Sequence, residues 1–70
     1  DGDGAEKAYR AALALDADYA MAHYKLAHIY ARREAREQTI LHARRYLQSA
    51  AGDERQTEEI HRLLREAEVP

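Results

Sequence analysis

Apolar residues recur at helical spacing in residues 19–30, which read YAMAHYKLAHIY. At about 100° per residue, one helix face contains His23, Leu26, Ala27 and Tyr30, with Tyr19 beside them. The opposite side is mixed aromatic and basic, and it contains Met21, Tyr24, Lys25, His28 and Arg32. We therefore expect a helix whose first face lies in a core. On this pattern, replacing Tyr24 or Arg32 should leave folding nearly unchanged.

The pattern loses its phase after Tyr30. A helix continuing through residues 31–39 would place charged side chains such as Glu34 on the core face. The next apolar set would also emerge roughly 130° from the first face; it comprises Ile40, Ala43, Leu47 and Ala50. A tight turn near Glu34 to Arg36, with a helix of about 15 residues on each side, removes both conflicts. The alternative is a single long helix.

The rest of the chain is also typical of helices. Alanine, leucine, arginine and glutamate dominate, and β-branched residues are scarce, so we expect an all-α fold. Residues 54–68 should form a closing helix that is apolar on one side and charged elsewhere, and a second break should fall at Ala51 to Asp53. Asp53 has Gln56 three residues later, the spacing of an N-cap. Asp18 is the corresponding candidate before residue 20.

A shift of 34 residues superimposes the apolar positions. It places Leu13 on Leu47, Leu26 on Ile60, Ile29 on Leu63 and Tyr30 on Leu64. A helix-turn-helix period of this length resembles the tetratricopeptide repeat family. His23, Leu26, Ala27 and Tyr30 fit the first helix of that pattern, with His23 in place of the usual tryptophan.

The second helix of the pattern is matched twice. Thr39, Ala43 and Tyr46 fit it with the last two sizes exchanged, and the upstream residues Ala5, Tyr9 and Ala12 fit it better. Ala17 and Ala51 stand where the family usually has proline, and Glu34 stands where the inner turn usually has glycine.

The resemblance implies one unit over residues 1–70, part of an α-α superhelix of antiparallel helix-turn-helix repeats. Residues 3–15 would be the second helix of a preceding repeat, residues 20–53 one complete repeat, and residues 54–68 the closing helix. We expect one set of side chains to be buried together: Leu26, Tyr30, Ile40, Leu47, Ile60 and Leu64.

Composition narrows the function. Seventy residues are close to the size at which a lone hydrophobic core is marginal, and no cysteine is present to reinforce it. No apolar run approaches the ~20 residues of a membrane span. Phosphate-binding loops, zinc-protease motifs and cysteine nucleophiles are absent, so we expect no enzyme and no cofactor. Localisation cannot be read from this chain.

The histidines do not form a metal motif. His23 and His28 are five residues apart and lie on different helix faces, so they cannot bind one ion together. We expect His23 to be partly buried and His28 to be solvated. A site assembled across helices with His42 or His61 is the open alternative.

Charge is unevenly distributed although the total is −2. Residues 19–51 carry +4, while residues 1–18 and residues 52–70 each carry −3. The acidic ends oppose nucleic acid, so we expect a solvated basic face answered by acidic helices. RNA binding through the arginine-rich hairpin is the alternative.

The leading functional hypothesis is a non-enzymatic scaffold for protein–protein interaction. In tetratricopeptide arrays partner segments lie on a concave face, and the resemblance assigns that face to Met21, Tyr24, Lys25, His28, Arg32, Arg55, Glu58 and Arg62. We expect a protein or peptide partner with acidic groups. An unperturbed His28 would titrate near pH 6.5, so binding should tighten modestly from about pH 7.5 to 6. The alternative is that this face is an ordinary solvated surface that binds no partner.

A second hypothesis concerns assembly. The apolar side of residues 3–15 would be uncovered in this chain, and it contains Ala5, Tyr9, Ala12 and Leu13. A structural cap or homo-oligomerisation module, with a homodimer formed through this helix, is therefore the alternative function. We expect Tyr9→Glu to dissociate such a dimer.

Overall fold

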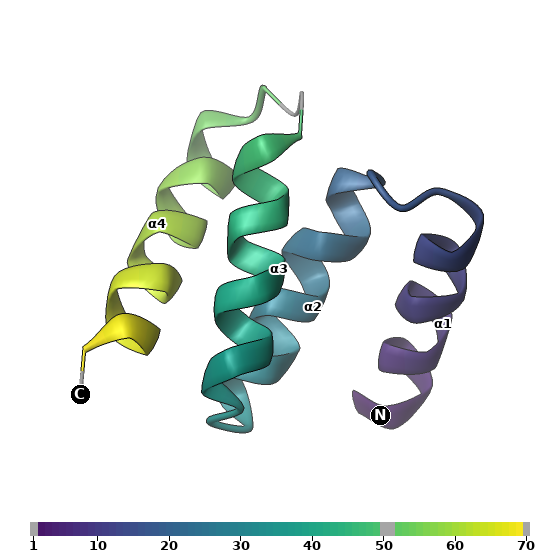
Figure 1. Ribbon diagram of the computed structural model, residues 1–70, viewed down its shortest axis with the longest axis horizontal. Coiled ribbons are helices and arrows are strands. Elements are labelled where there is room, and N and C mark those ends of the chain that lie inside the picture. The colour runs from purple at the N-terminus through teal and green to yellow at the C-terminus, as the bar shows by residue number, and fades with distance from the viewer. Residues whose placement is uncertain (1, 50–51, 70) are drawn as a thin grey trace.

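The computed structural model describes residues 2–49 and 52–69. This part of the chain forms four α-helices and no strand: α1 (Gly2–Leu15), α2 (Ala20–Arg32), α3 (Arg36–Gln48) and α4 (Glu54–Glu68). The helices pack sequentially in antiparallel fashion (Figure 1), which confirms the all-α prediction. Ala50 and Ala51, to which the sequence assigned a core position and part of a turn, lie outside the described residues.

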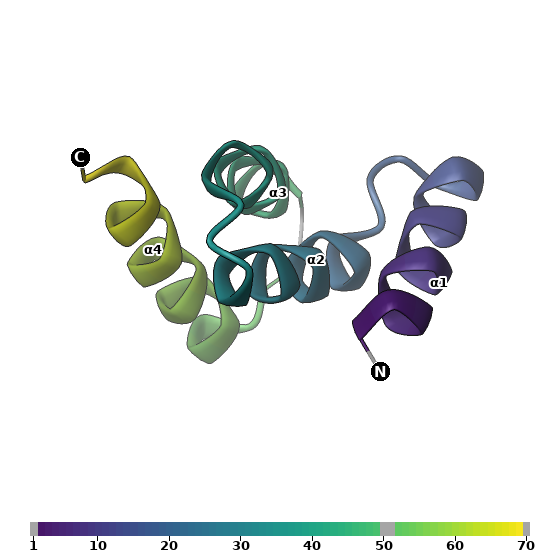
Figure 2. The same ribbon diagram turned by 90° about the horizontal axis from the view of Figure 1, so that it is seen from below.

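The helices are ordered in space as they are along the chain. Each helix packs on the next, and α2 also packs on α4, whereas α1 contacts α2 alone among the described helices. Figure 2 shows α2 between α1 and α4, with α3 lying across one side of α2. The helices α1 and α3 begin 34 residues apart, at Gly2 and Arg36, and so do α2 and α4, at Ala20 and Glu54.

The turn between α2 and α3 comprises residues 33–35, so the break is confirmed one residue earlier than predicted. The Glu34 amide N–H donates to the Ala31 carbonyl (3.1 Å), and the Ala35 N–H donates to the Tyr30 carbonyl (2.9 Å). These two bonds form a Schellman motif, in which the left-handed residue is usually glycine. Here Glu34 takes that conformation, with φ of 57°, at a cost of roughly 1 kcal/mol.

The two predicted N-caps have different outcomes. The Asp53 carboxylate accepts a hydrogen bond from the Gln56 N–H (3.0 Å), so this N-cap is confirmed. The Asp18 prediction is wrong, because α2 has Tyr19 as its N-cap and no side chain bonds to its first turn. The Asp18 N–H instead donates to the Asp16 carboxylate (3.1 Å), which closes a local turn before the helix begins.

The core consists of two clusters instead of the single predicted set. The central cluster joins α2, α3 and α4, and its buried members are Ala27, Ala43, Tyr46, Ile60 and Leu63. The α1–α2 cluster has Leu26, Ile29 and Tyr30 as its buried members. Leu26 and Tyr30 are therefore separated from Ile60, because opposite sides of α2 face α1 and α4.

The predicted core position of Ile40 is wrong. The face of α3 that is buried contains Thr39, Ala43 and Tyr46, and Ile40 is only half-buried beside the exposed Leu41. Thr39 can be buried because its hydroxyl donates to the Ala35 carbonyl (2.9 Å). Leu47 and Leu64 are half-buried at the edge of the central cluster. The packing role expected for Tyr19 is also wrong, since this residue is 44% exposed.

Candidate functional site

A groove of about 430 Å³ lies between α1 and α2. Its walls combine apolar side chains from both helices with basic side chains from α2: Ala5, Tyr9, Tyr24, Lys25, His28, Ile29 and Arg32. The groove forms because, among the described helices, α1 contacts α2 and no second helix, which leaves a flank of each uncovered by the described residues. The structure thus joins four of the predicted partner-binding residues to two of the predicted self-association residues.

Tyr24 lies between the groove and the core. Its hydroxyl donates to the Glu59 carboxylate of α4 (2.5 Å), and its ring contacts the Tyr46 ring at 5.9 Å between centroids. The bond to Glu59, with burial, raises the pKa of Tyr24 to about 12. Tyr24 packs against the central cluster, so we expect its replacement to lower stability, in contrast to the expectation from the sequence.

His28 is half-buried, which corrects the prediction that it is solvated. Its Nε2 atom is buried and has no hydrogen-bond partner among the described residues. Its ring stands edge-on to the Tyr24 ring, with centroids 4.7 Å apart. Burial, together with the charges of Arg32, Lys25 and Arg62, lowers the pKa of His28 against the opposing effect of Glu59. His28 is therefore neutral at pH 7.

Two fully charged side chains border the groove. Lys25 and Arg32 are both exposed, and they lie seven residues apart on α2, two helical turns along one side. The Lys25 ammonium stands over the Tyr24 ring, 5.6 Å from its centroid, a geometry that favours a cation on an aromatic face. No carboxylate is among the residues that line the groove in the described chain. The groove therefore has a positive rim.

An ion-pair network fastens α1 to the C-terminal end of α2. The Glu6 carboxylate accepts hydrogen bonds from the Tyr30 hydroxyl (2.5 Å) and the Arg33 guanidinium (2.6 Å), which also donates to Asp3 (3.1 Å). The bonds from Tyr30 and Arg33 hold the pKa of Glu6 below its ordinary value. Because the Glu6 carboxylate is paired with Tyr30 and Arg33, it does not neutralise the charges of Lys25 and Arg32 at the groove.

A histidine pair lies between α2 and α3. The His23 Nε2–H donates to the Ala17 carbonyl (2.8 Å), and the Nδ1 atoms of His23 and His42 share a hydrogen bond of 3.0 Å. The Tyr30 ring stacks on His42 at 5.6 Å. Burial lowers the pKa of His42 to about 4, with further effects from His23, Arg10 and Arg45. The described residues contain no group of three ligands able to hold a metal ion.

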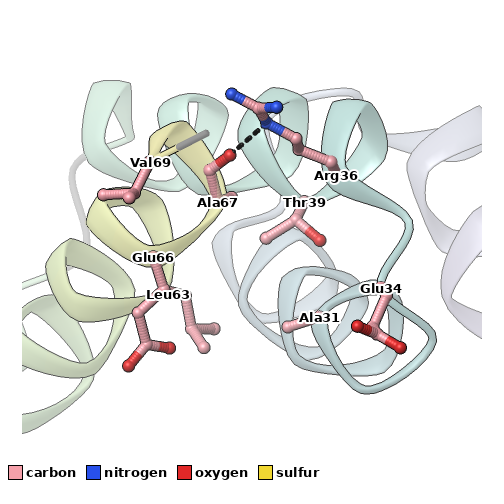
Figure 3. A pocket seen from close by; sticks show the side chains of 8 residues that line it. All are labelled: Ala31, Glu34, Arg36, Thr39, Leu63, Glu66, Ala67 and Val69. Carbon is pink, nitrogen blue, oxygen red and sulfur yellow. Dashed lines mark hydrogen bonds between the residues drawn. The ribbon is translucent and has the colours of Figure 1, made fainter.

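A second hollow, of about 280 Å³, lies between the α2–α3 turn and the end of α4 (Figure 3). Thr39 and Leu63 form its inner wall, while Glu34, Arg36 and Glu66 stand at its mouth. The Arg36 guanidinium donates to the carbonyl of Ala67 and, at 3.2 Å, to that of Glu68. Arg36 thus satisfies the last carbonyls of α4. The polar contacts at this hollow therefore serve to hold the end of α4 in place.

The remaining predicted partner-binding residues are not in the groove. Arg55, Glu58 and Arg62 are exposed along α4, where they line a separate shallow surface. Met21 is exposed and does not line the groove. Of the predicted self-association residues, Ala5, Tyr9 and Leu13 pack against the α1–α2 cluster, and Ala12 is half-buried.

The arginine-rich hairpin proposed for RNA binding is largely engaged within the chain. Arg33 bonds to Glu6 and Asp3, Arg36 bonds to the end of α4, and Arg44 donates to the Glu68 carboxylate (2.6 Å). Lys25 and Arg32, in contrast, line the α1–α2 groove.

Sequence reasoning missed Ile29 as a wall of the groove, and it assigned Ala5 and Tyr9 to a different function from Tyr24. The 34-residue register contains the signal for both, because it pairs α1 with α3 and so shows which flank of α1 should receive a further helix.

No protein-family model matches the sequence, and comparisons with curated proteins and with solved structures give no significant match. In the described part of the chain, no helix has the length and apolar character needed to span a membrane.

Proposed function

We propose that the chain is a non-enzymatic protein-interaction module of the tetratricopeptide type, which binds an acidic partner segment in the α1–α2 groove. The observation that carries this proposal is the groove lining, which combines apolar walls with the cations Lys25 and Arg32 and contains no carboxylate. The offset of 34 residues between equivalent helix starts supports the repeat type.

The chemistry of the groove defines the partner. Ala5 and Tyr9, which are half-buried, offer apolar contact area, and the two cations attract carboxylates and speed the encounter. Because both cations are exposed, salt should weaken binding. The pH dependence predicted from a solvated His28 is replaced, since its pKa is lowered in the free protein. We expect little tightening through His28 between about pH 7.5 and 6.

The test uses charge reversal against an immobilised array of synthetic peptides of about 15 residues, each with two acidic residues spaced among apolar ones. Lys25→Glu combined with Arg32→Glu should weaken the tightest interaction by about 10-fold or more, because two exposed charge pairs account for about 1–2 kcal/mol. Lys7→Glu, an exposed site on α1 outside the groove, is the matched control for Lys25→Glu. Equal losses for Lys7→Glu and Lys25→Glu would contradict a defined site.

A second candidate function is self-association through α1. Leu15 is 92% exposed at the end of α1, and Ala8 and Ala11 are exposed on the same helix. Tyr9→Glu would disturb folding as well as a dimer, because Tyr9 packs against the α1–α2 cluster. Leu15→Glu is the better variant. Sedimentation equilibrium that shows a dimer for the wild type and a monomer for Leu15→Glu would support assembly as the function.

A further inference from the structure

The α1–α2 and α3–α4 contacts are built from residues 34 positions apart. The buried residues Leu26, Ile29 and Tyr30 of α2 pack against three residues of α1: Ala5, Tyr9 and Leu13. The corresponding residues of α4 are Ile60, Leu63 and Leu64, and those of α3 are Thr39, Ala43 and Leu47. Ala43, Ile60 and Leu63 are buried in the central cluster, and Leu47 and Leu64 pack at its edge. Thr39 lines the hollow beside Leu63.

A third helix occupies the surface that α3 and α4 form together. It is α2, which packs there through small side chains and one tyrosine: Ala20, Tyr24, Ala27 and Ala31. This contact buries Thr39, Ala43 and Tyr46 of α3. The surface made by α3 and α4 is thus a seat for a helix with small residues at its contact positions.

The corresponding surface of α1 and α2 is uncovered. Thr39, Ala43 and Tyr46 are buried, whereas the residues 34 positions earlier, Ala5, Tyr9 and Ala12, are all only half-buried. Ala5, Tyr9 and Ile29 also line the α1–α2 groove. The groove therefore lies where the repeat register places the seat of a further helix.

We infer that the α1–α2 groove is the seat of a partner protein's amphipathic helix, bound as α2 is bound on α3 and α4. This inference rests on the proposed function and specifies its ligand. The partner helix has small apolar residues at the positions of Ala20, Ala27 and Ala31, and an acidic residue at the position of Tyr24.

The acidic residue follows from a reversal of charge between the two seats. In the occupied seat, the Tyr24 hydroxyl of α2 donates to Glu59 (2.5 Å). In the groove, the residue equivalent to Glu59 is Lys25, and the residue equivalent to Glu66 is Arg32. A cation cannot accept a hydrogen bond, so the partner needs an acceptor where α2 presents a donor, and a carboxylate makes the strongest bond to Lys25.

His28 provides an independent indication of a ligand. It lines the groove, and its Nε2 atom is buried without a hydrogen-bond partner among the described residues. Buried polar atoms are normally satisfied, so this unsatisfied atom of a groove residue points to a polar group supplied by a ligand.

A second copy of this chain fits the seat less well. The outer face of α4 carries Glu58 at the position of Tyr24, but it has large polar residues, Glu54, His61 and Arg65, where the seat takes small apolar ones. The helix α1 is rich in alanine, but its internal carboxylate, Glu6, is already held by Tyr30 and Arg33. A partner helix that combines small apolar residues with a free carboxylate is therefore favoured.

The experiment titrates the intact 70-residue chain with peptides that copy residues 19–33. One peptide carries Tyr24→Glu, a second carries Tyr24→Lys, and a third carries Tyr24→Glu with Ile29→Pro to prevent helix formation. The glutamate peptide should bind about 3-fold more tightly than the lysine peptide, and Lys25→Glu in the protein should reverse that order. The proline peptide should bind about 100-fold more weakly.

Amide chemical shifts locate the bound peptide. Changes should concentrate at Ala5, Tyr9 and Ile29, and changes confined to Ala43 and Leu63 would overturn the inference. Equal binding of the proline peptide would also overturn it while leaving an extended acidic partner possible, so the proposed function would survive. If neither the peptides nor the acidic array respond to Lys25→Glu, both proposals fail. A dimer that the glutamate peptide does not dissociate would assign the seat to a second copy.

Discussion

The two ends of the helix stack present opposite surfaces. At the α1 end the outward side is apolar, with Ala5, Tyr9 and Ala12 half-buried and Leu15 92% exposed. At the α4 end the outward side is charged, because Glu58, His61 and Arg65 occupy the positions at which α2 has Tyr24, Ala27 and Ala31. Both ends follow the same 34-residue spacing of helix positions, and the side chains alone make one end apolar and the other polar and charged.

This difference changes what it costs to expose each end of the helix stack to solvent. An outward face of Glu, His and Arg is well solvated and costs little to expose, so α4 closes the core. An outward face of alanine, tyrosine and leucine gains free energy when it is covered. The ion-pair network of Glu6 and Arg33 holds α1 in place without covering that face.

The largest effect should come from the closed part of the molecule. Tyr46 is 2% exposed and contacts Tyr24, and its hydroxyl donates to Gln56 (3.2 Å). Tyr46→Ala should lower the free energy of unfolding by roughly 3–5 kcal/mol, as deletion of a buried aromatic does. Tyr9→Ala, in the half-buried α1, should cost about 1 kcal/mol. Urea denaturation of both variants measures this, and equal losses would remove the distinction between the two parts.

Lowering the pH should reduce stability through the middle of the helix stack, where His42 lies, before it acts through the α1 end. The folded pKa of His42 is about 4, below its ordinary value of 6.5, so the unfolded chain takes up the proton first. Stability is therefore complete above about pH 6.5 and falls as the pH drops toward 4. The groups that face His42 are His23 and Tyr30 of α2, Arg10 of α1 and Arg45 of its own helix.

Thermal unfolding at several pH values tests this assignment. His42→Gln should flatten the decline in Tm between pH 6.5 and 4.5, because glutamine does not titrate. His61→Gln, which removes an exposed histidine of α4, is the matched control and should leave the decline unchanged. An identical decline in wild type and His42→Gln would show that another group is responsible. Glu6, with its lowered pKa, adds a loss only below its ordinary value of 4.5.

The helix N-termini give a smaller contrast between equivalent positions. Asp53 caps α4, whereas Tyr19, 34 residues earlier, leaves the first turn of α2 without a side-chain cap. Asp53→Ala should destabilise the fold by about 1 kcal/mol, and Tyr19→Asp should stabilise it by about 0.5–1 kcal/mol. Chemical denaturation of the two single variants measures both changes. A loss of stability in Tyr19→Asp would mean that the tyrosine has a packing role.

The smallest effect on global unfolding should come from the network that fastens α1. Glu6→Gln removes the charge that pairs with Arg33 and weakens the bond from Tyr30, but α1 contacts only α2 among the described helices. We expect faster cleavage of α1 by a protease at low concentration, with little change in the urea midpoint. Lys7→Gln, an exposed neighbour on the same helix, is the control and should leave the cleavage rate unchanged.

The sequence predicts the helices well because their signals are local. Loss of apolar phase after Tyr30 indicates the turn in which Glu34 takes the left-handed conformation, and the Asp53–Gln56 spacing indicates the start of α4. The predicted core position of Ile40 was wrong because a pattern built from apolar residues alone leaves the neighbouring Thr39 out of the core. Thr39 is buried since its hydroxyl bonds to the backbone, which a count of apolar residues does not register.

The site is less predictable because it depends on contacts between helices. Tyr24 lies off the first apolar face of α2 and still packs against the core, because α2 is covered on two sides. His23 and His42 are 19 residues apart, and their bond depends on how α3 rests on α2. Lys25 and Arg32 could be placed on one face from spacing alone, whereas the wall that Ala5 and Tyr9 add required the position of α1.

Amide hydrogen exchange of α1 and α3, with and without the peptide of residues 19–33 that carries Tyr24→Glu, tests the open seat most directly. The helices begin 34 residues apart and are nearly equal in length, yet only α3 is covered by two other helices. We predict that α1 amides exchange faster than α3 amides in the unbound protein, and that the peptide slows α1 exchange while leaving α3 unchanged. Equal protection of α1 and α3 without peptide, or no change in α1 when peptide binds, would contradict the open seat.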